Sequence, residues 1–145
     1  MKYKLYNILL VIFIIAGHVS AQQGFYVPEN GTIFLARGTI TVFSDVTNNG
    51  KIGMGENTVI NFKGTYWQNS LNSMITDRSH AGEGITGRSG LIRFIGDSQQ
   101  SLNGGYNAAI KAGASFYDLE INNPLGVRLY NGSAKLRNHL VLKKG

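Results

Sequence analysis

Two short apolar runs that each end in glycine are the feature that most constrains the fold of this chain. Residues 59–64 (VINFKG) and 91–96 (LIRFIG) share one pattern, and they end at Gly64 and Gly96, a 32-residue offset. Asn-Asn pairs at residues 48–49 and 122–123 close two further runs. Repeated short strands that end at similar turn residues are typical of stacked strand units.

Composition favours a folded, turn-rich, all-β chain. The 145 residues include 19 glycines and 2 prolines but no cysteine, and 43% of the residues are hydrophobic. Glycine and asparagine accept the backbone angles of tight turns, and the apolar content is too high for a disordered chain. Since no disulfide can form, packing and hydrogen-bond ladders must stabilise the fold.

The segment from Met1 to Ala21 has the layout of a secretory signal peptide. Lys2 and Lys4 precede an apolar run over residues 8–16, and small residues precede a cleavage point after Ala21. A transmembrane anchor is the weaker interpretation, because crossing a bilayer takes about 20 apolar residues and this run breaks at residues 17–18. Cleavage after Ala21 leaves residues 22–145, which are enough for one modest domain.

The net charge of the exported chain indicates which classes of partner it can bind. The formal charge of +6 falls to +4 once the two leader lysines are removed, which allows contact with anionic glycans or phosphates. A nucleic-acid partner is not expected, because the exported chain has no arginine tract.

Alternating apolar residues and turn signals predict about nine or ten short strands and no helix. The clearest runs cover residues 32–36, 39–43, 59–62, 98–103, 116–121, 127–129 and 134–142, while residues 51–55 form a weaker segment loosened by glycine. Residues 65–90 lack such a pattern and are interpreted as an excursion loop. Gln68 and Gln100 each follow their glycine by four positions, which predicts that the two copies stay in step beyond it.

The fold predicted is a β-solenoid, a parallel β-helix-like stack of short strands, with a β-sandwich as the alternative. A sandwich would show clean hairpin alternation, whereas a solenoid places like residues on like from coil to coil. The Asn pairs, each just after a strand, favour stacking.

Two motifs in the predicted loop lack the helix that each would need for its function. Residues 82–87 match G-x-G-x-x-G, but a strand rather than a helix is expected after them, so a flexible loop is the preferred interpretation. Asp77, His80 and Glu83 have a spacing that would suit a divalent metal on a helix, yet the surrounding glycines favour a polar loop. No cofactor and no metal site are therefore expected.

Asp118 and Glu120 are the candidate catalytic carboxylates. Alternate residues of one strand point the same way and lie about 7 Å apart, a distance relevant to glycoside hydrolysis. Nothing apolar in the neighbouring sequence is placed to raise the pKa of either carboxyl group, so a solvated strand face is the preferred interpretation.

Aromatic and basic residues give candidate contacts with a glycan or another polyanion. Tyr66 and Trp67 resemble a stacking platform for a sugar ring, although packing is the expected role of such residues. Along residues 134–142 and just beyond, alternation predicts a row of basic side chains that could bind a polyanion, although an exposed strand whose charges discourage edge pairing is the preferred interpretation. This row consists of Lys135, Arg137, His139 and Lys143.

The order of these motifs resembles the amino-terminal region of large exported surface proteins of Bacteroidota. The resemblance rests on residues 48–50 (NNG), 60–69 (INFKGTYWQN), 92–96 (IRFIG) and 116–123 (FYDLEINN). It implies a β-rich, adhesin-like stalk segment that precedes further domains and a carboxy-terminal sorting domain. It brings no catalytic residues.

We therefore expect a non-catalytic, exported structural or adhesive module at the cell surface, outer membrane or outside the cell. Its expected partners are extracellular polysaccharide or a neighbouring surface protein, and it has no transmembrane anchor of its own. The chain is expected to be the leading segment of a larger protein, truncated at its C-terminal end. The alternative function is a glycan-binding or polysaccharide-degrading β-solenoid.

Overall fold

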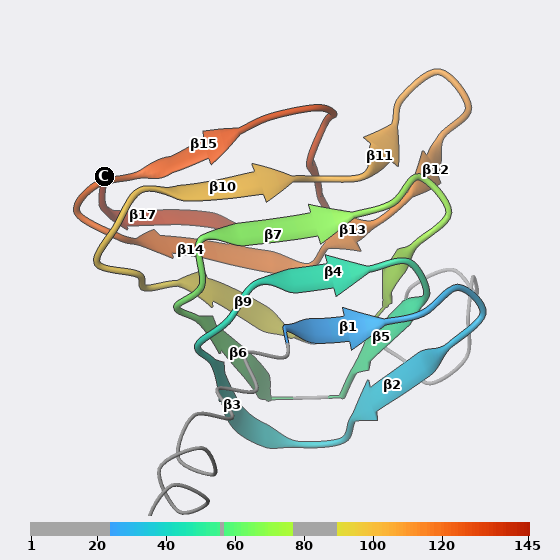
Figure 1. Cartoon of the computed structure of the whole chain (residues 1–145), viewed down its shortest axis with the longest axis horizontal. Coiled ribbons are helices and arrows are strands. Elements are labelled where there is room, and N and C mark those ends of the chain that lie inside the picture. The colour runs from blue at the N-terminus through green and yellow to red at the C-terminus, as the bar shows by residue number, and fades with distance from the viewer. Residues whose placement is uncertain (1–23, 56, 77–89) are drawn as a thin grey trace, which may run out of the picture.

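The chain forms a parallel β-helix with three faces. The structure, a computed structural model, describes residues 24–55, 57–76 and 90–145. Face 1 is a five-stranded sheet built from β1 (Phe25–Val27), β4 (Val46–Asn48), β7 (Tyr66–Asn69), β10 (Gln100–Asn103) and β15 (Val127–Leu129). Figure 1 shows these five strands stacked one above another, with β15 uppermost.

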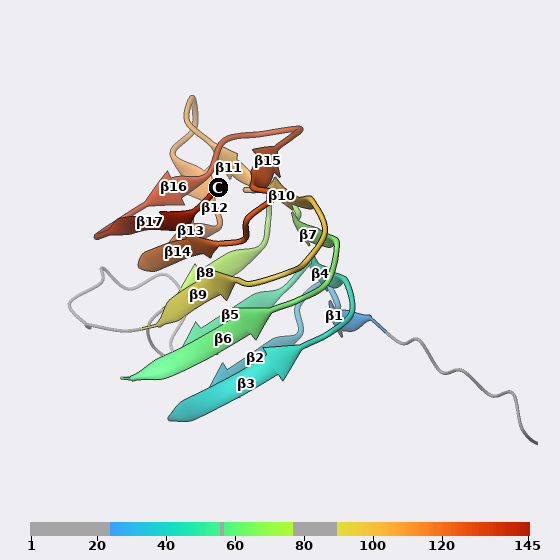
Figure 2. The same cartoon turned by 90° about the vertical axis from the view of Figure 1, so that its left-hand side faces the viewer.

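The other two faces complete each coil. Face 3 is the five-stranded sheet of β3 (Gly38–Val42), β6 (Thr58–Phe62), β9 (Leu91–Phe94), β14 (Asp118–Asn122) and β17 (Leu140–Lys144). Face 2 combines β2 (Thr32–Leu35), β5 (Lys51–Met54) and β8 (Met74–Thr76) with the pair β13 (Ser115–Phe116) and β16 (Lys135–Leu136), because β13 lies against β8. Figure 2 shows faces 2 and 3 stacked in the same order. The predicted solenoid is therefore confirmed.

The length of an uninterrupted coil follows from the pairing of the strands. Phe25 pairs with Val46 and Val46 with Trp67, a 21-residue offset in both cases, whereas Thr39 pairs with Val59, a 20-residue offset. The two glycine-ended runs stack as predicted, with Ile60 opposite Ile92, but their 32-residue offset is one coil lengthened by an insertion that includes residues 77–89. A second insertion is the antiparallel hairpin of β11 (Tyr106–Asn107) and β12 (Ala112–Gly113).

Inward side chains fill the interior in ladders. Ile92 lies over Ile60 and beneath Leu119, and all three are at most 4% exposed. At the centre, Phe62 meets Trp67 and Phe94 edge to face, with ring centroids 5.4 Å and 5.1 Å apart. Burial of such rings contributes about 2 to 3 kcal/mol each, so this aromatic cluster is a main source of stability.

Buried amides close the corners between the faces. At the corner from face 1 to face 2, Asn48 Nδ2 donates to Asn69 Oδ1 at 3.1 Å, and Trp67 Nε1 donates to the same oxygen at 3.2 Å. Asn123 lies at a different corner, where its Nδ2 donates to Gln100 Oε1 at 2.9 Å. The two Asn pairs therefore do not stack on each other. Asn48 and Asn123 instead form hydrogen bonds with buried polar groups, each at its own corner.

Two predictions about strand boundaries are wrong. Residues 65–90 are not wholly a loop, since they begin with β7 and β8 of the stack. Gln68 and Gln100 are out of step, because Leu102 pairs with Trp67 and Asn103 with Gln68. On face 3 the paired residues Ile60 and Ile92 are 32 positions apart, whereas on face 1 the paired residues Trp67 and Leu102 are 35 positions apart. The turn between the two faces is therefore longer in the later coil.

The predicted strand over residues 134–142 is also corrected. It is divided into β16 and β17, which lie on faces 2 and 3, and residues 137–139 form the corner between them. The alternation in sequence continues across the corner because Leu136 of β16 and Leu140 and Leu142 of β17 lie an even number of residues apart and all occupy inward positions. No helix in the described part of the chain is long and apolar enough to cross a membrane. The predicted signal peptide lies outside the described residues.

Candidate functional site

The predicted aromatic platform does not exist as a pair. Trp67 is fully buried in the core, because it occupies an inward position of β7 between Val46 and Leu102. Tyr66 points outward and is half exposed, with its ring 6.4 Å from that of Tyr130. Only Tyr66 of the two remains available to a ligand.

The predicted basic row is divided between two faces. Lys135 lies on β16 with its Nζ 4.9 Å from the Tyr106 ring, and Arg137 lies at the corner with its guanidinium 5.4 Å from the Tyr117 ring. His139 and Lys143 belong to the face 3 side of the coil. The four side chains therefore form no continuous cationic stripe, since the strand that would have aligned them turns between Leu136 and Leu140.

Face 3 carries a chain of polar contacts that crosses four coils. Arg93 Nη1 donates to Asn61 Oδ1 at 3.3 Å, and Arg93 Nε lies 2.8 Å from Glu120 Oε1. The other carboxylate oxygen of Glu120 lies 3.2 Å from Lys143 Nζ. The Glu120 side chain is only 5% exposed, so its charge is held between two cations rather than solvated as the sequence suggested.

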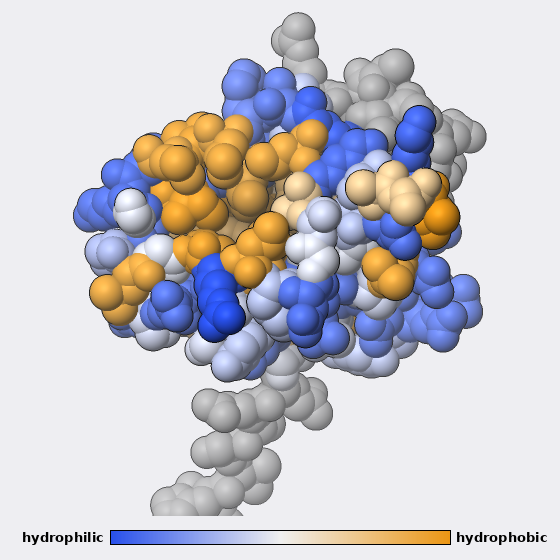
Figure 3. All heavy atoms as spheres, turned by 90° about the horizontal axis from the view of Figure 1, so that it is seen from above, coloured by the Kyte–Doolittle hydropathy of each residue, from blue (hydrophilic) through white to orange (hydrophobic). Residues whose placement is uncertain are grey.

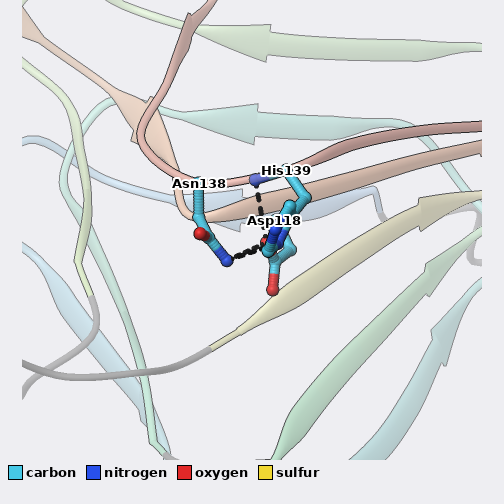
Figure 4. A network of polar contacts seen from close by, with 3 residues as sticks. All are labelled: Asp118, Asn138 and His139. Atoms are coloured by element: carbon cyan, nitrogen blue, oxygen red, sulfur yellow. Dashed lines mark hydrogen bonds and ion pairs between the residues drawn. The ribbon is translucent and has the colours of Figure 1, made fainter.

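The second carboxylate is engaged in a neighbouring network, drawn in Figure 4. Asp118 Oδ1 accepts from Asn138 Nδ2 at 2.8 Å and from the His139 backbone N–H at 3.1 Å, and it lies 3.3 Å from His139 Nδ1. These contacts join coil 4 to the corner of coil 5. Asp118 and Glu120 do point the same way, as predicted, but each is bound to neighbouring side chains of the stack.

A groove lies at the corner from face 3 to face 1, and the sequence analysis did not predict it. It has a volume of about 460 Å³ and is formed by three successive turns. Its lining includes Phe43 to Asp45, Lys63 to Thr65, Asp97 and Ser98. Such a groove assembles only when turns from different coils lie one above another, so no local pattern predicts it.

The groove combines an exposed ring with charged groups. Phe43 is 74% exposed, and Lys63 Nζ lies 5.5 Å from its centroid. Asp45 Oδ1 accepts from the backbone N–H groups of Thr65 and Tyr66 at 2.9 Å and 2.8 Å, which fixes one wall. The single signal in the sequence is that Phe43 alternates away from the apolar face of its strand. A flat ring beside carboxylates and an amine is an arrangement that suits a sugar.

The loop motifs remain outside what the structure describes. Residues 82–87, with the G-x-G-x-x-G spacing, and the trio Asp77, His80 and Glu83 all fall within residues 77–89. Among the described residues, no group of three or more His, Asp or Glu side chains is arranged to hold a metal ion.

Comparison with known proteins returned no match to a family model, a curated protein or a solved structure.

Proposed function

We propose that the chain is an exported, non-catalytic structural or adhesive module of a cell-surface protein. The single observation that supports this best is that the ionisable side chains of face 3 form ion pairs between coils. Glu120 is held by Arg93 and Lys143, and these contacts join successive coils. Glu120 is committed to contacts within the stack and is only 5% exposed, whereas glycoside cleavage needs a pair of carboxyl groups that reach the scissile bond.

The proposed role also agrees with how the interior is filled. The largest buried side chains, among them Trp67, Phe62 and Phe94, pack against one another along the axis. A β-helix packed in this way offers ligands its outer faces, corners and ends rather than an internal pocket. A rigid surface of this kind suits a spacer or an adhesive segment.

Export is tested on the native protein. Cells that make the chain are separated into cytoplasm, outer membrane and medium, and the product is analysed by intact mass and N-terminal sequencing. We expect a product that begins at Gln22 in the outer-membrane or medium fraction. A product that keeps Met1 and stays in the cytoplasm would contradict the proposal. A mass well above 15.8 kDa would identify the chain as a segment of a larger surface protein.

A second candidate function, glycan binding, is favoured by the corner groove. The exposed ring of Phe43 can stack on a sugar face, while Asp97 and Lys63 line the same groove and can bond to hydroxyl groups.

The groove variant is Phe43→Ala, and its matched control is Phe34→Ala, which removes an exposed ring from face 2. Binding is measured by calorimetry and by NMR titration with neutral and uronic-acid hexasaccharides. We expect the groove variant to weaken binding by about tenfold, the typical value of one stacked aromatic contact, and the control to leave it unchanged. Equal binding by both variants, or no binding by the unaltered chain, would count against this function.

A further inference from the structure

The groove near Phe43, the first groove, has a counterpart at the opposite ends of the same strands. This second groove lies at the corner from face 1 to face 2 and has a volume of about 310 Å³. Turns from three successive coils form it, as they form the first groove. Figure 1 shows the two corners at the two ends of β1, β4 and β7. The residues that line the second groove are Tyr26, Glu29, Asn49, Ser70 and Asn72.

The second groove combines an exposed ring with polar side chains on stacked turns. The Asn49 N–H donates to the Val27 carbonyl at 2.8 Å. The Ser70 N–H donates to the Asn48 carbonyl at 2.9 Å, so the three turns are held one above another. The Tyr26 ring is 57% exposed, and the amides and hydroxyl group beside it can donate and accept hydrogen bonds. This combination suits a hydroxyl-rich sugar.

The outer surface of face 1 joins the two grooves. Thr65 lines the first groove and Ser70 the second, and β7 runs between them. At 3.3 Å per residue the two positions are about 16 Å apart, which is longer than a disaccharide. Tyr66 lies between the grooves with its ring half exposed, and the exposed Gln68 lies beside Thr47 of β4. No residue of β1, β4 or β7 carries a charge.

The charges around this surface favour a neutral ligand. Asp45, Asp97 and Lys63 line the first groove, and Glu29 is the one charged residue in the lining of the second. Three carboxylates against one amine disfavour a uronic acid or another polyanion. In the view from above in Figure 3, apolar side chains gather over the last coil, whereas the outer rim of the stack is mainly hydrophilic. A lipid is therefore a poor fit for face 1.

We propose that face 1 binds a single chain of a neutral polysaccharide, which runs along β1, β4 and β7 from the first groove to the second. The rings of Phe43 and Tyr26 stack on sugars at the two ends, and the ring of Tyr66 stacks on a sugar between them. Because the parallel ladder holds these strands and turns, the surface exists before the ligand binds, which lowers the entropic cost of binding. The proposal rests on glycan binding, the second candidate function, and it extends that function from one groove to a whole face.

The test compares neutral β-linked hexose disaccharides and hexasaccharides by calorimetry and NMR titration on the exported product. We expect the hexasaccharide to bind about tenfold more tightly or better, because only the longer ligand reaches both grooves. Tyr66→Ala and Tyr26→Ala should each weaken its binding by about tenfold, the typical value of one stacked ring. Tyr66→Phe keeps the ring and should bind as the unaltered chain does. Phe34→Ala, which removes an exposed ring from face 2, is the matched control.

The class of ligand is tested with Glu29→Gln. The unaltered chain should prefer the neutral hexasaccharide to the uronic-acid hexasaccharide, and the variant should narrow this preference, because it removes the carboxylate that lines the second groove.

The possible outcomes separate this proposal from glycan binding in general. Binding that is weakened by Phe43→Ala but unchanged by Tyr26→Ala and Tyr66→Ala would overturn the proposal and leave the first groove as a glycan site. Equal affinity for the disaccharide and the hexasaccharide, or tighter binding of the uronic-acid hexasaccharide, would also overturn it. No binding of any of these glycans by the unaltered chain would overturn both.

Discussion

Gln100 shows how a single buried amide joins successive turns of the stack. Its Nε2 donates to the backbone carbonyls of Phe62 and Gly64 at 3.1 Å and 2.8 Å. Its Oε1 accepts from the Gly96 N–H at 3.1 Å and from Asn123 Nδ2 at 2.9 Å. The side chain is fully buried. The Phe62 carbonyl also accepts from the Ile95 N–H and Asn123 Nδ2 also donates to the Ser98 carbonyl, so the Gly64 carbonyl and the Gly96 N–H depend most on Gln100.

We predict that Gln100→Leu destabilises the fold by about 2 to 4 kcal/mol, because it removes four buried hydrogen bonds, including those to the Gly64 carbonyl and the Gly96 N–H. Gln68→Leu is the matched control, since Gln68 points outward from β7 and is exposed. Its expected cost is below about 0.5 kcal/mol. Urea unfolding followed by circular dichroism measures both values. A cost for Gln100→Leu as small as that of the control would show that water replaces the amide at this corner.

At the scale of the strand, the last coil is attached through more than its backbone ladder. β17 pairs with β14 over four positions, with a register shift at its end. Lys143 of β17 reaches Glu120 of β14, and the Asp118 network binds the corner that precedes β17. Among the described strands, β17 pairs with β14 alone, and these side-chain contacts help to hold it there.

We predict that Glu120→Gln loosens β17 while the stack stays folded. Loss of the carboxylate removes the charge that Arg93 and Lys143 share, and since both cations are partly exposed the cost is about 1 kcal/mol. Amide hydrogen exchange over β17 should then become roughly fivefold faster, whereas β6 and β9 should be unchanged. The control is Glu29→Gln, the same chemical change at an exposed residue of the first coil. Equal exchange over β17 in both variants would assign no role to this contact.

At the scale of the whole molecule, the β-helix explains where the predicted ligand contacts lie and why Trp67 has the packing role that was expected of it. In a solenoid, a residue is inside or outside according to its place in the coil, and a corner moves the chain onto another face. Trp67 was expected at the mouth of a loop but lies on β7, where its position points to the axis. The basic row was expected on one strand but crosses a corner. The groove near Phe43 needed three turns from three coils.

The sequence by itself determined the class of fold and the pairing of its clearest units. Short apolar alternation, turn glycines and the 32-residue copies were sufficient to predict stacked parallel strands, because strand propensity and turn chemistry are local. Only the tertiary structure decided the coil length, the corner reached by each amide and the partners of Glu120. Each of these depends on which residues lie one coil above or below. The insertion that includes residues 77–89 changes the residue offset between coils. The spacing of motifs in the sequence therefore does not determine which residues lie above one another.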